Sequence, residues 1–416
     1  MANWPIEKLG DLAEISAGNS APQDEVLFKN GAHPFIRTSD VGKIRFGEID
    51  ASIDRLNEAG IKGLRKFLRG TILLPKSGAS TFLNHRVIMS IDGYVSSHLA
   101  TVKARPSKVL DKFLLYYLSI VQAQSLIQDH AYPSLRLSDL ENIDVPVPTL
   151  DEQKRIVAIL DEAFAGIAAA TANAEKNLAN ARTLVDVAIE EQLSRISQGQ
   201  HQETTVAQLA EDRKNSIRTG PFGSQLLHGE FVDEGIAVLG IDNVVQNQFR
   251  WDKRRYITPN KFQELARYKV LPGDVLISIM GTCGRCAVVP GDISLAINSK
   301  HLCCISLDQS RCLPEFLKLY FLHHPVAKNY LDERASGAIM AGLNMGIIKD
   351  LPVLLPCVKE QAVIAGTCER LSRGLSDLTE LYSRKRANLA DLKQAILQKA
   401  FSGELSGIKT RHCEAA

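Results

Sequence analysis

The sequence predicts an α+β protein in which two repeated mixed α/β globular domains are joined by two long helices. These helices are expected to form an antiparallel intramolecular coiled coil with pseudo-twofold symmetry. The chain contains an internal duplication, and each half begins with short apolar runs and ends in a long run without proline. Its 416 residues are 45% hydrophobic and 23% charged, which excludes a largely disordered chain, a collagen and a disulfide knot.

The duplication has a period of 203 to 208 residues. The first part of each half aligns at an offset of 203, with the pairs Gly70 and Gly273, Gly78 and Gly281, His98 and His301, Phe113 and Phe316. The second part aligns at an offset of 208, with the pairs Pro148 and Pro356, Glu152 and Glu360, Gln153 and Gln361, Leu184 and Leu392. The two halves should therefore share one fold.

The first part of each half is expected to consist of strands and turns followed by a short helix. Apolar runs bounded by Gly, Pro, Asn and Asp are typical of strands. The expected strands are residues 35–36, 71–74 and 87–91 in the first half, and 237–241 and 275–279 in the second. Helical patterns follow at residues 111–127 and 314–331.

The second part of each half is expected to be one long helix that begins after a proline. Pro148 and Pro356 stand just before the helices, where proline is tolerated. The helices should run from residue 150 to about 196 and from 358 to about 401, roughly 65–70 Å each at ~1.5 Å per residue. The predicted boundaries are 1–149 and 199–357 for the globular domains, 150–198 and 358–405 for the helices, and 406–416 for a tail.

A heptad pattern in each long helix predicts that the two helices pack on each other. The stripe of the first helix is mostly small: Leu160, Ala163, Ile167, Ala170, Ala174, Asn177, Ala181, Leu184 and Ala188. The equivalent stripe of the second is mostly large: Cys368, Leu371, Leu375, Leu378, Tyr382, Lys385, Leu389, Leu392 and Ile396. Small against large gives close packing, and the connectivity makes the pair antiparallel. The alternative is that each helix packs only on its own globular domain.

Two similar domains joined by a rod suggest a partner with twofold character, such as duplex DNA. Two unlike readers would bind two half-sites separated by a gap that the helices set. The net charge is only +2, and residues 1–149 and 200–357 each carry 17 basic and 16 acidic residues, so any DNA-binding surface must be local. Candidate contacts are basic, hydroxyl and amide side chains near loops and turns: Lys43, Arg45, Lys76, Ser77, Ser80, Thr81, Ser224, Gln225, Arg250, Lys253, Arg254, Arg255, Thr282 and Arg285. A further basic set at helical spacing is Lys62, Arg65, Lys66 and Arg69.

The sequence has no motif for catalysis or for a bound cofactor. It lacks a phosphate-binding Gly-x4-Gly-Lys-Ser/Thr loop, an Asn-Pro-Pro-Tyr-like methyltransferase motif and a convincing S-adenosylmethionine loop. The one zinc-like arrangement is Cys283 and Cys286 with Cys303 and Cys304, and the first half has no equivalent cysteines, so we expect no metal. The paired His98 and His301 have no nucleophile or carboxylate that repeats with them, so a core or DNA-facing role is expected.

The chain resembles the specificity (S) subunits of type I restriction–modification systems over nearly its whole length. The motifs that carry the resemblance are TGPFGSQL at 219–226, GDVLISIMGTCG at 273–284, VPVPTLDEQKRIVAIL at 145–160, VLLPCVKEQAVIAG at 353–366 and LKQAILQKAFSGEL at 392–405. The resemblance implies two target recognition domains, docking of two methyltransferase (M) subunits on the spacer helices, and no catalysis by this chain. It also implies that S-adenosylmethionine and ATP with Mg²⁺ are bound by the M and restriction (R) subunits. The first half lacks a GPFGS segment and has Gly18-Asn19-Ser20 in its place. Because the two domains differ in this way, they should read different half-sites.

Two other interpretations stay open on the sequence. A coiled-coil adaptor whose globular domains bind protein would explain the near-zero net charge. A stand-alone DNA-modifying enzyme would use His98 or His301 and would turn over without partners. The N-terminus has no basic and apolar leader, and no uncharged apolar run reaches about 18 residues, so we expect a cytoplasmic protein without a membrane span.

Overall fold

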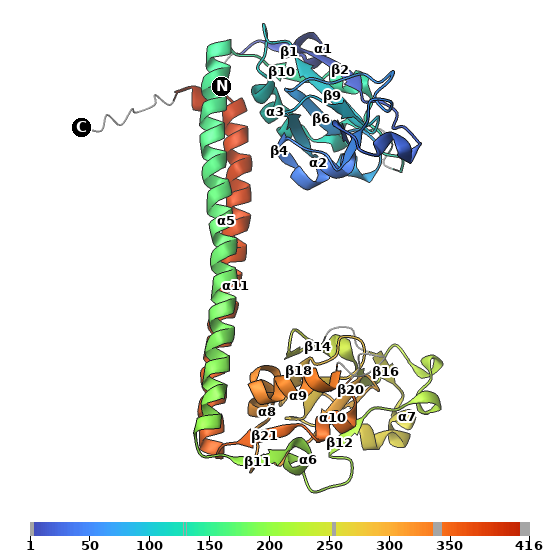
Figure 1. Ribbon diagram of the computed structural model, residues 1–416, viewed down its shortest axis with the longest axis vertical. Helices are drawn as coiled ribbons and strands as arrows, with labels where there is room; N and C mark the ends of the chain where they lie inside the picture. The colour runs from blue at the N-terminus through green and yellow to red at the C-terminus, as the bar shows by residue number, and fades with distance from the viewer. Residues whose placement is uncertain (1–3, 128, 130, 252–254, 336–342, 408–416) are drawn as a thin grey trace, which may run out of the picture. The chain divides into compact units, whose positions relative to one another are not determined.

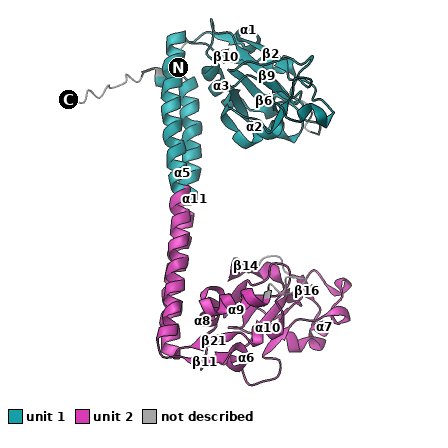
Figure 2. Cartoon of the chain, viewed as in Figure 1, with its two compact units in different colours: residues 1–174, 383–416 teal, residues 175–382 magenta. Residues whose placement is uncertain are grey.

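The structure is a computed structural model that describes residues 4–127, 129, 131–251, 255–335 and 343–407. The chain forms two compact units (Figure 2). Unit 1 comprises residues 1–174 and 383–416, and unit 2 comprises residues 175–382. Each unit therefore contains one globular domain and one end of both long helices.

The globular domain of unit 1 contains a five-stranded sheet and two smaller sheets (Figure 1). The large sheet has the strand order β2-β9-β6-β7-β4, and its central strand β6 is buried along its whole length. The smaller sheets have the orders β5-β3-β8 and β1-β10. The strands are β1 (Ile6–Lys8), β2 (Ala13–Ala17), β3 (His33–Ile36), β4 (Phe46–Ile49), β5 (Asp54–Leu56), β6 (Thr71–Pro75), β7 (Arg86–Met89), β8 (Tyr94–Val95), β9 (Leu99–Ala104) and β10 (Asp144–Pro146).

Unit 2 repeats this plan. Its large sheet has the order β12-β20-β17-β18, and the smaller sheets have the orders β16-β13-β19, β11-β21 and β14-β15. The strands are β11 (Gln202–Thr205), β12 (Ile217–Thr219), β13 (Ile236–Leu239), β14 (Val244–Val245), β15 (Gln248–Phe249), β16 (Arg255–Ile257), β17 (Val275–Ser278), β18 (Cys286–Val288), β19 (Ala296–Asn298), β20 (Leu302–Ile305) and β21 (Pro352–Leu355). In both units one pair of the three-stranded sheet is parallel, β3 with β8 and β13 with β19.

The shared strand orders confirm the predicted α+β class and the duplication. The units differ at one edge of the large sheet. In unit 1, β4 adds a strand parallel to β7, whereas in unit 2 the β14-β15 hairpin forms a separate sheet. The short helices are α1 (Leu9–Leu12), α2 (Thr38–Ile44), α3 (Asp111–Ile120) and α4 (Leu137–Glu141) in unit 1, and α6 (Val206–Leu209), α7 (Pro259–Glu264), α8 (Pro314–His323), α9 (Pro325–Ala335) and α10 (Met345–Lys349) in unit 2.

Two predicted helices are shorter than the sequence pattern suggested. The expected helix 314–331 is divided into α8 and α9, because the residue before a proline is disfavoured in the helical region, and His324 before Pro325 is extended at ψ 132°. The expected helix 111–127 ends at Ile120. There the buried guanidinium of Arg86 donates hydrogen bonds to the carbonyl oxygens of Leu118 and Val121 and so satisfies the end of α3.

The two long helices, α5 (Leu150–Ser194) and α11 (Val358–Phe401), pack together within each unit. In unit 1 the start of α5 and the end of α11 share one core, which contains Ile156, Leu160 and Leu397. In unit 2 the end of α5 and the start of α11 share another, which contains Leu193 and Ile364. The helices are therefore antiparallel, and each end also packs on the globular domain of its own unit.

The predicted stripes are only half correct. Positions of one heptad class, such as Leu160, Ala174 and Cys368, are buried. Positions of the other class are half-buried near the start of each stripe, as at Ala163 and Leu371. Further along they turn outward, so that Leu184 is 70% exposed, Leu392 48% and Leu378 39%. A helix with 3.6 residues per turn drifts by about 20° per heptad from a strict seven-residue repeat, so a stripe drawn over this length leaves the interface.

A buried glutamine joins each long helix to its globular domain. Gln153 near the start of α5 accepts a hydrogen bond from the backbone N–H of Leu110 at 2.9 Å and donates to the carbonyl oxygens of Lys108 and Pro148. The repeat-related Gln361 of α11 makes the same three contacts, with Leu313, Arg311 and Pro356. Both glutamines are 0% exposed. These contacts explain why a glutamine recurs at the start of both helices.

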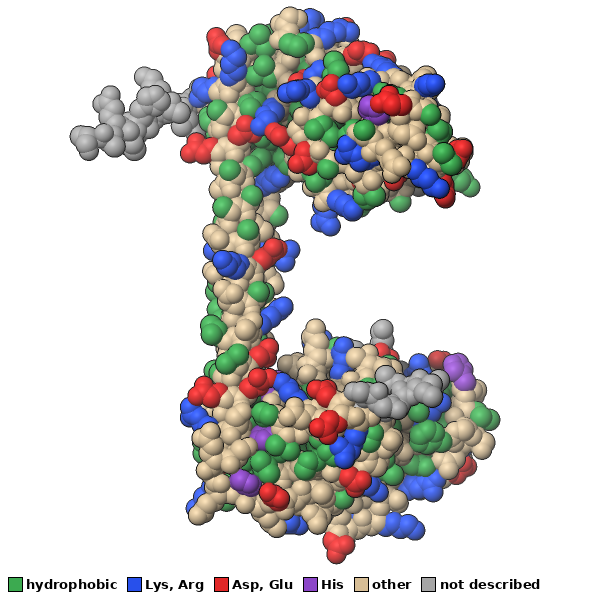
Figure 3. Space-filling model, in the orientation of Figure 1, with side chains coloured by type: hydrophobic (Ala, Val, Ile, Leu, Met, Phe, Trp, Pro, Cys, Tyr) green, Lys and Arg blue, Asp and Glu red, His purple; other side chains and the backbone are tan. Residues whose placement is uncertain are grey.

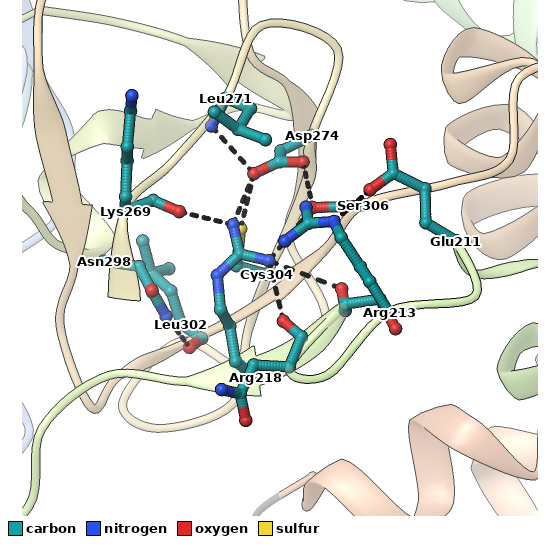
Figure 4. A network of polar contacts seen from close by, with 12 residues as sticks. Glu211, Arg213, Arg218, Lys269, Leu271, Asp274, Asn298, Leu302, Cys304 and Ser306 are labelled. Carbon is teal, nitrogen blue, oxygen red and sulfur yellow. Dashed lines mark hydrogen bonds and ion pairs between the residues drawn. The ribbon is translucent and has the colours of Figure 1, made fainter. Parts of the chain in front are cut away.

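The two globular domains differ in the chemistry buried inside their sheets. In unit 2, Arg218 of β12 pairs with Asp274 at 2.6 Å, and Ser306 and the backbone N–H of Leu271 donate to the same carboxylate (Figure 4). In unit 1, the position of Arg218 is occupied by Ser16, whose hydroxyl lies 2.7 Å from that of Thr101. The shared strand plan therefore carries different interior polar groups.

One 18-residue window within residues 150–198 has a mean hydropathy of 1.4, so length and composition alone would allow this helix to cross a membrane. A single helix of this kind is weak evidence for a span, because helices of soluble proteins meet the same criterion. Here both ends of the helix carry side chains of the two cores, such as Leu160 and Leu193.

Candidate nucleic-acid interface

In unit 1 the predicted glycine-containing loop packs against the segment that carries His98. The loop follows β6 and continues into a 3-10 helix at Ala79–Leu83. The backbone N–H of Lys76 donates to the carbonyl oxygen of His98 at 2.9 Å, and the Ser77 hydroxyl lies 2.7 Å from Nδ1 of the imidazole. Residue 78 has φ +75°, a conformation that favours glycine.

Unit 2 repeats this junction with different side chains. The backbone N–H of Ile279, which corresponds to Lys76, donates to the carbonyl oxygen of His301 at 2.9 Å. Burial lowers the pKa of His301, and the charges of Lys300 and Arg255 lower it further, so the imidazole is neutral at neutral pH. The paired histidines therefore lie at equivalent places beside equivalent glycine-containing loops, Gly78 and Gly281.

The TGPFGSQL segment begins with a tight contact that also recurs. A Cβ atom on Gly220 would lie 2.1 Å from the carbonyl oxygen of Asn298, which excludes any larger residue without backbone movement. In unit 1, a Cβ on Gly18 would lie 2.3 Å from the carbonyl oxygen of Ser96. Gly18-Asn19-Ser20 therefore occupies the place of the GPFGS segment, as the alignment of the halves predicted.

In unit 2 these segments enclose a pocket of about 460 Å³. It is lined by residues of the loop 221–231, the segment 238–243, Arg255 and the segment 299–301. Of these lining residues, Arg255 and the TGPFGSQL segment were predicted from the sequence, and His301 was expected to be a core or DNA-facing residue. Lys300 and Asp242 were not predicted, because one charged residue in a loop has no pattern that marks its direction.

Most of the other candidate residues are on the surface but in separate places. Lys43, Arg45, Ser224, Gln225, Arg250, Arg255 and Thr282 are exposed, and Lys76, Ser77, Ser80 and Arg285 are half-buried. Lys253 and Arg254 lie outside the described residues. Thr81 is corrected by the structure, because its side chain is buried and its hydroxyl donates to the carbonyl oxygen of Gly78. It cannot contact DNA from this position.

The basic set Lys62, Arg65, Lys66 and Arg69 is also corrected. These residues lie in turns and extended chain, and Gly63 at φ +76° interrupts any helix there. Carboxylates neutralise two of them, since Arg65 pairs with Glu14 and Lys66 with Asp92. This set does not form one basic helix face.

The cysteines and histidines show no arrangement for zinc or for catalysis in the described part of the chain. Cys286, Cys303 and Cys304 are buried, and burial raises the pKa of Cys286 and of Cys303 to about 12, so that without a bound cation both are protonated thiols at neutral pH. No group of three metal-binding side chains comes together among the described residues. Ser77 lies beside His98, but no carboxylate contacts that imidazole in the described region to complete a triad.

Charges of both signs are mixed over the visible face of each unit (Figure 3). This pattern agrees with the balanced counts of basic and acidic residues in the two globular segments. Any site for a polyanion must therefore be a local group of cations without carboxylate partners.

Comparison with known proteins identifies related sequences over most of the chain. A profile of the type I restriction modification DNA specificity domain matches residues 1–178 and 239–386. The type I restriction enzyme EcoBI specificity subunit of Escherichia coli is 23% identical over 429 residues, 97% of this chain and 86% of the relative. The MjaVIII specificity subunit of Methanocaldococcus jannaschii is 20% identical over 421 residues, 97% of this chain and 93% of the relative.

Two solved structures share the fold. A chain from a study of complex assembly and conformational transition in a type I restriction–modification system has a TM-score of 0.75 and 18% identity, and the match covers 96% of this chain and 98% of that chain. The HsdS subunit of Thermoanaerobacter tengcongensis has a TM-score of 0.59 and 17% identity, over 97% of this chain and 98% of that subunit. At these identities the likeness establishes the fold.

Proposed function

Since this chain belongs to the family of type I restriction–modification specificity subunits, we propose that it reads a bipartite, asymmetric DNA target with one half-site for each recognition domain. The family confers DNA sequence specificity and is itself non-catalytic. The finer proposal concerns how this chain divides the target between its two units.

The observation that carries this proposal is the contrast between a repeated plan and unlike loops. The same strand orders support both units. At the repeated junction, Lys76-Ser77-Gly78 in unit 1 corresponds to Ile279-Met280-Gly281 in unit 2. Because base reading depends on the side chains that loops present, two copies of one plan with different loops suit two different half-sites.

Catalysis is assigned to partners in this proposal. Two methyltransferase subunits would bind S-adenosylmethionine and methylate adenine, and restriction subunits would use ATP and Mg²⁺ to cleave DNA. A stacked adenine must be extruded from the duplex before it can be methylated, and this step also belongs to the methyltransferase. The complex would act in the cytoplasm.

The spacer helices would dock the methyltransferase subunits. Leu184 of α5 and Leu392 of α11 are related by the duplication, and both are large apolar side chains that point to solvent. A single exposed leucine is ordinary on a folded surface, but its recurrence at the repeat-related position of both helices supports a contact site for another protein. One such position in each half suits one methyltransferase subunit per unit.

A domain exchange tests the division of the target. The full chain is co-expressed with its methyltransferase subunits in a host that lacks other adenine methylation, and methylated adenines are mapped in the genome. Replacing residues 200–357 by the corresponding segment of another specificity subunit should change one half-site and leave the other and the gap unchanged. A change in both half-sites, or in neither, would contradict the proposal.

A further inference from the structure

The pocket of unit 2 contains cations that no described carboxylate neutralises. Arg255 and Lys300 are exposed, and no carboxylate of the described residues forms an ion pair with either side chain. Asp242 is the one carboxylate in the lining. Arg255, Lys300 and Asp242 together give the lining a formal charge of +1, in a domain whose charges otherwise balance.

The wall of the pocket is aromatic beside these cations. The Arg255 guanidinium lies 5.7 Å from the centroid of the Phe231 ring, and the His228 ring meets Phe231 edge-on at 6.2 Å. A guanidinium held against an aromatic ring keeps its N–H donors free for an anion. Phe231 in turn offers an apolar surface to a sugar or a base.

The backbone around the pocket is held in place by buried contacts. Asn243 accepts from the N–H of Gly240 at 2.9 Å and donates to the carbonyl oxygen of Arg250 at 2.8 Å, which closes the segment 240–250 into a fixed loop. The close approach of Gly220 to Asn298 fixes the TGPFGSQL segment against the strand that leads to Lys300. Lys300 follows β19 at this contact, and Arg255 stands in β16 opposite Val238 of β13, so both cations are presented from the three-stranded sheet.

We infer that this pocket binds one phosphodiester of the DNA backbone beside the second half-site, with Arg255 and Lys300 pairing with the phosphate and Phe231 contacting the adjoining deoxyribose. The inference rests on the proposed function. The pocket volume of about 460 Å³ exceeds what a phosphate alone would fill and accommodates a phosphate with its sugar. Phosphate contacts fix the position of a protein on the duplex and carry no base information, so this pocket positions unit 2 on the DNA.

Salt dependence distinguishes a phosphate contact from a base contact. Each phosphate contact contributes about 0.9 to the slope of log K against log salt concentration. Between roughly 50 and 200 mM salt, a variant that lacks the contact should therefore lose about 3.5-fold less affinity than the wild type. The full chain with its methyltransferase subunits is titrated with a duplex that carries the mapped target and with one that does not. Because both cations pair with one phosphate, the double variant with Arg255→Ala and Lys300→Ala should reduce the slope by about 0.9, and each single variant should reduce it by part of that amount. Each variant should weaken binding to both duplexes by the same factor.

The control is Lys214→Ala, which removes an exposed lysine of unit 2 that does not line the pocket. It should leave the slope unchanged, and Arg255→Lys should retain most of it because the charge is kept. Thermal unfolding confirms that each variant is folded. An unchanged slope in the double variant, an equal loss in Lys214→Ala, or a changed base preference at one position would each overturn the inference. If the wild-type complex binds neither duplex, the proposed function itself fails.

Discussion

At the scale of single residues, the buried glutamines show how a globular domain is fixed to a long helix. Each amide satisfies one backbone N–H and two carbonyl oxygens that burial would otherwise leave without partners. A buried donor or acceptor without a partner costs about 1–3 kcal/mol. The pair therefore contributes to stability in both units, through the same three contacts.

Replacing Gln361 by leucine should lower the free energy of unfolding by about 2 kcal/mol or more. The leucine fills the space but leaves the N–H of Leu313 and the carbonyl oxygens of Arg311 and Pro356 unpaired. Urea denaturation measures the change. Gln394→Leu is the matched control, because Gln394 is exposed on the same helix, and it should change the free energy by no more than about 0.5 kcal/mol. Equal effects of the two substitutions would contradict this role.

His324 should make the protein sensitive to mild acid. Its ring is buried and stacked on Tyr320 at 4.1 Å, and Nδ1 accepts a hydrogen bond from the N–H of Val326. Burial, with a smaller contribution from His201, lowers its pKa to about 4. The unfolded chain, with a pKa of about 6.5, then binds a proton more readily than the folded chain. The stabilisation is complete above about pH 6.5 and is lost as the pH falls towards 4, by on the order of 3 kcal/mol.

Denaturation midpoints measured from about pH 7 to about pH 4.5 test this dependence. The variant His324→Asn keeps a side-chain acceptor for Val326 and removes the titrating group. Its stability should fall less steeply than that of the wild type over this interval. Parallel curves for the two proteins would show that other groups cause the decline.

Residue patterns predicted which loops lie together but not the direction of each side chain. The repeat identified the glycine-containing loops, Gly18 and the paired histidines, because duplication keeps backbone contacts at fixed offsets. Thr81 was misplaced because a 3-10 turn directs its hydroxyl to Gly78. Lys300 was missed because its position in the pocket depends on the path of distant segments.

At the scale of elements, both long helices were predicted almost to the residue. A proline just before each helix indicated the starts at Leu150 and Val358, and the absence of proline after it indicated that each helix is long. The side chains facing the interface were harder to predict, since a small angular drift per heptad moves a position from the interface to the surface. The helix 314–331 was predicted as one element although it contains Pro325. This proline both ends α8 and occupies the first turn of α9, where proline is favoured, so the helical pattern continues on both sides of it.

The exposed leucines of the two helices should matter for assembly rather than for folding. Leu193→Ala removes a fully buried side chain and should cost about 2–5 kcal/mol of stability. Leu184→Ser and Leu392→Ser change exposed side chains and should leave the unfolding midpoint nearly unchanged. Under the proposed docking, each serine variant should lose one methyltransferase subunit and the double variant should lose both, as native mass spectrometry would measure. Retention of two subunits by the double variant would exclude these positions from the docking surface.

At the scale of the whole molecule, the duplication predicted that both units share one plan, and the strand orders agree. If the target is bipartite as proposed, the length of α5 and α11 should set the gap between its half-sites. The boundary between the units crosses α5 after Ala174 and α11 after Tyr382 (Figure 2). Heptads inserted at both points would lengthen the pair while preserving its antiparallel packing.

The number of inserted heptads should decide whether a lengthened chain still reads DNA. Three heptads add ~32 Å, or about 9 base pairs at ~3.4 Å each. Over this length the duplex turns about 50° short of a full right-handed turn, which leaves a base pair facing as if rotated about 50° in the left-handed sense. A coiled coil of ~150 Å pitch turns about 75° in the left-handed sense over the same length. The recognition domain and its half-site then stay aligned to within about 25°. One heptad adds about 3 base pairs, over which the duplex and the coiled coil turn in opposite senses, so that the recognition domain is rotated by about 130° from its half-site.

Mapping methylated adenines in cells that carry each variant measures the outcome. The variant with three heptads should methylate the same two half-sites with a gap longer by about 9 base pairs, because both readers again face the duplex. The variant with one heptad should lose most methylation, because one reader is turned away from its half-site while the other is in place. An unchanged gap in the three-heptad variant would mean that the helices do not set the spacing. Full activity of the one-heptad variant would mean that the attachment of each domain to its helix is too loose to transmit the rotation.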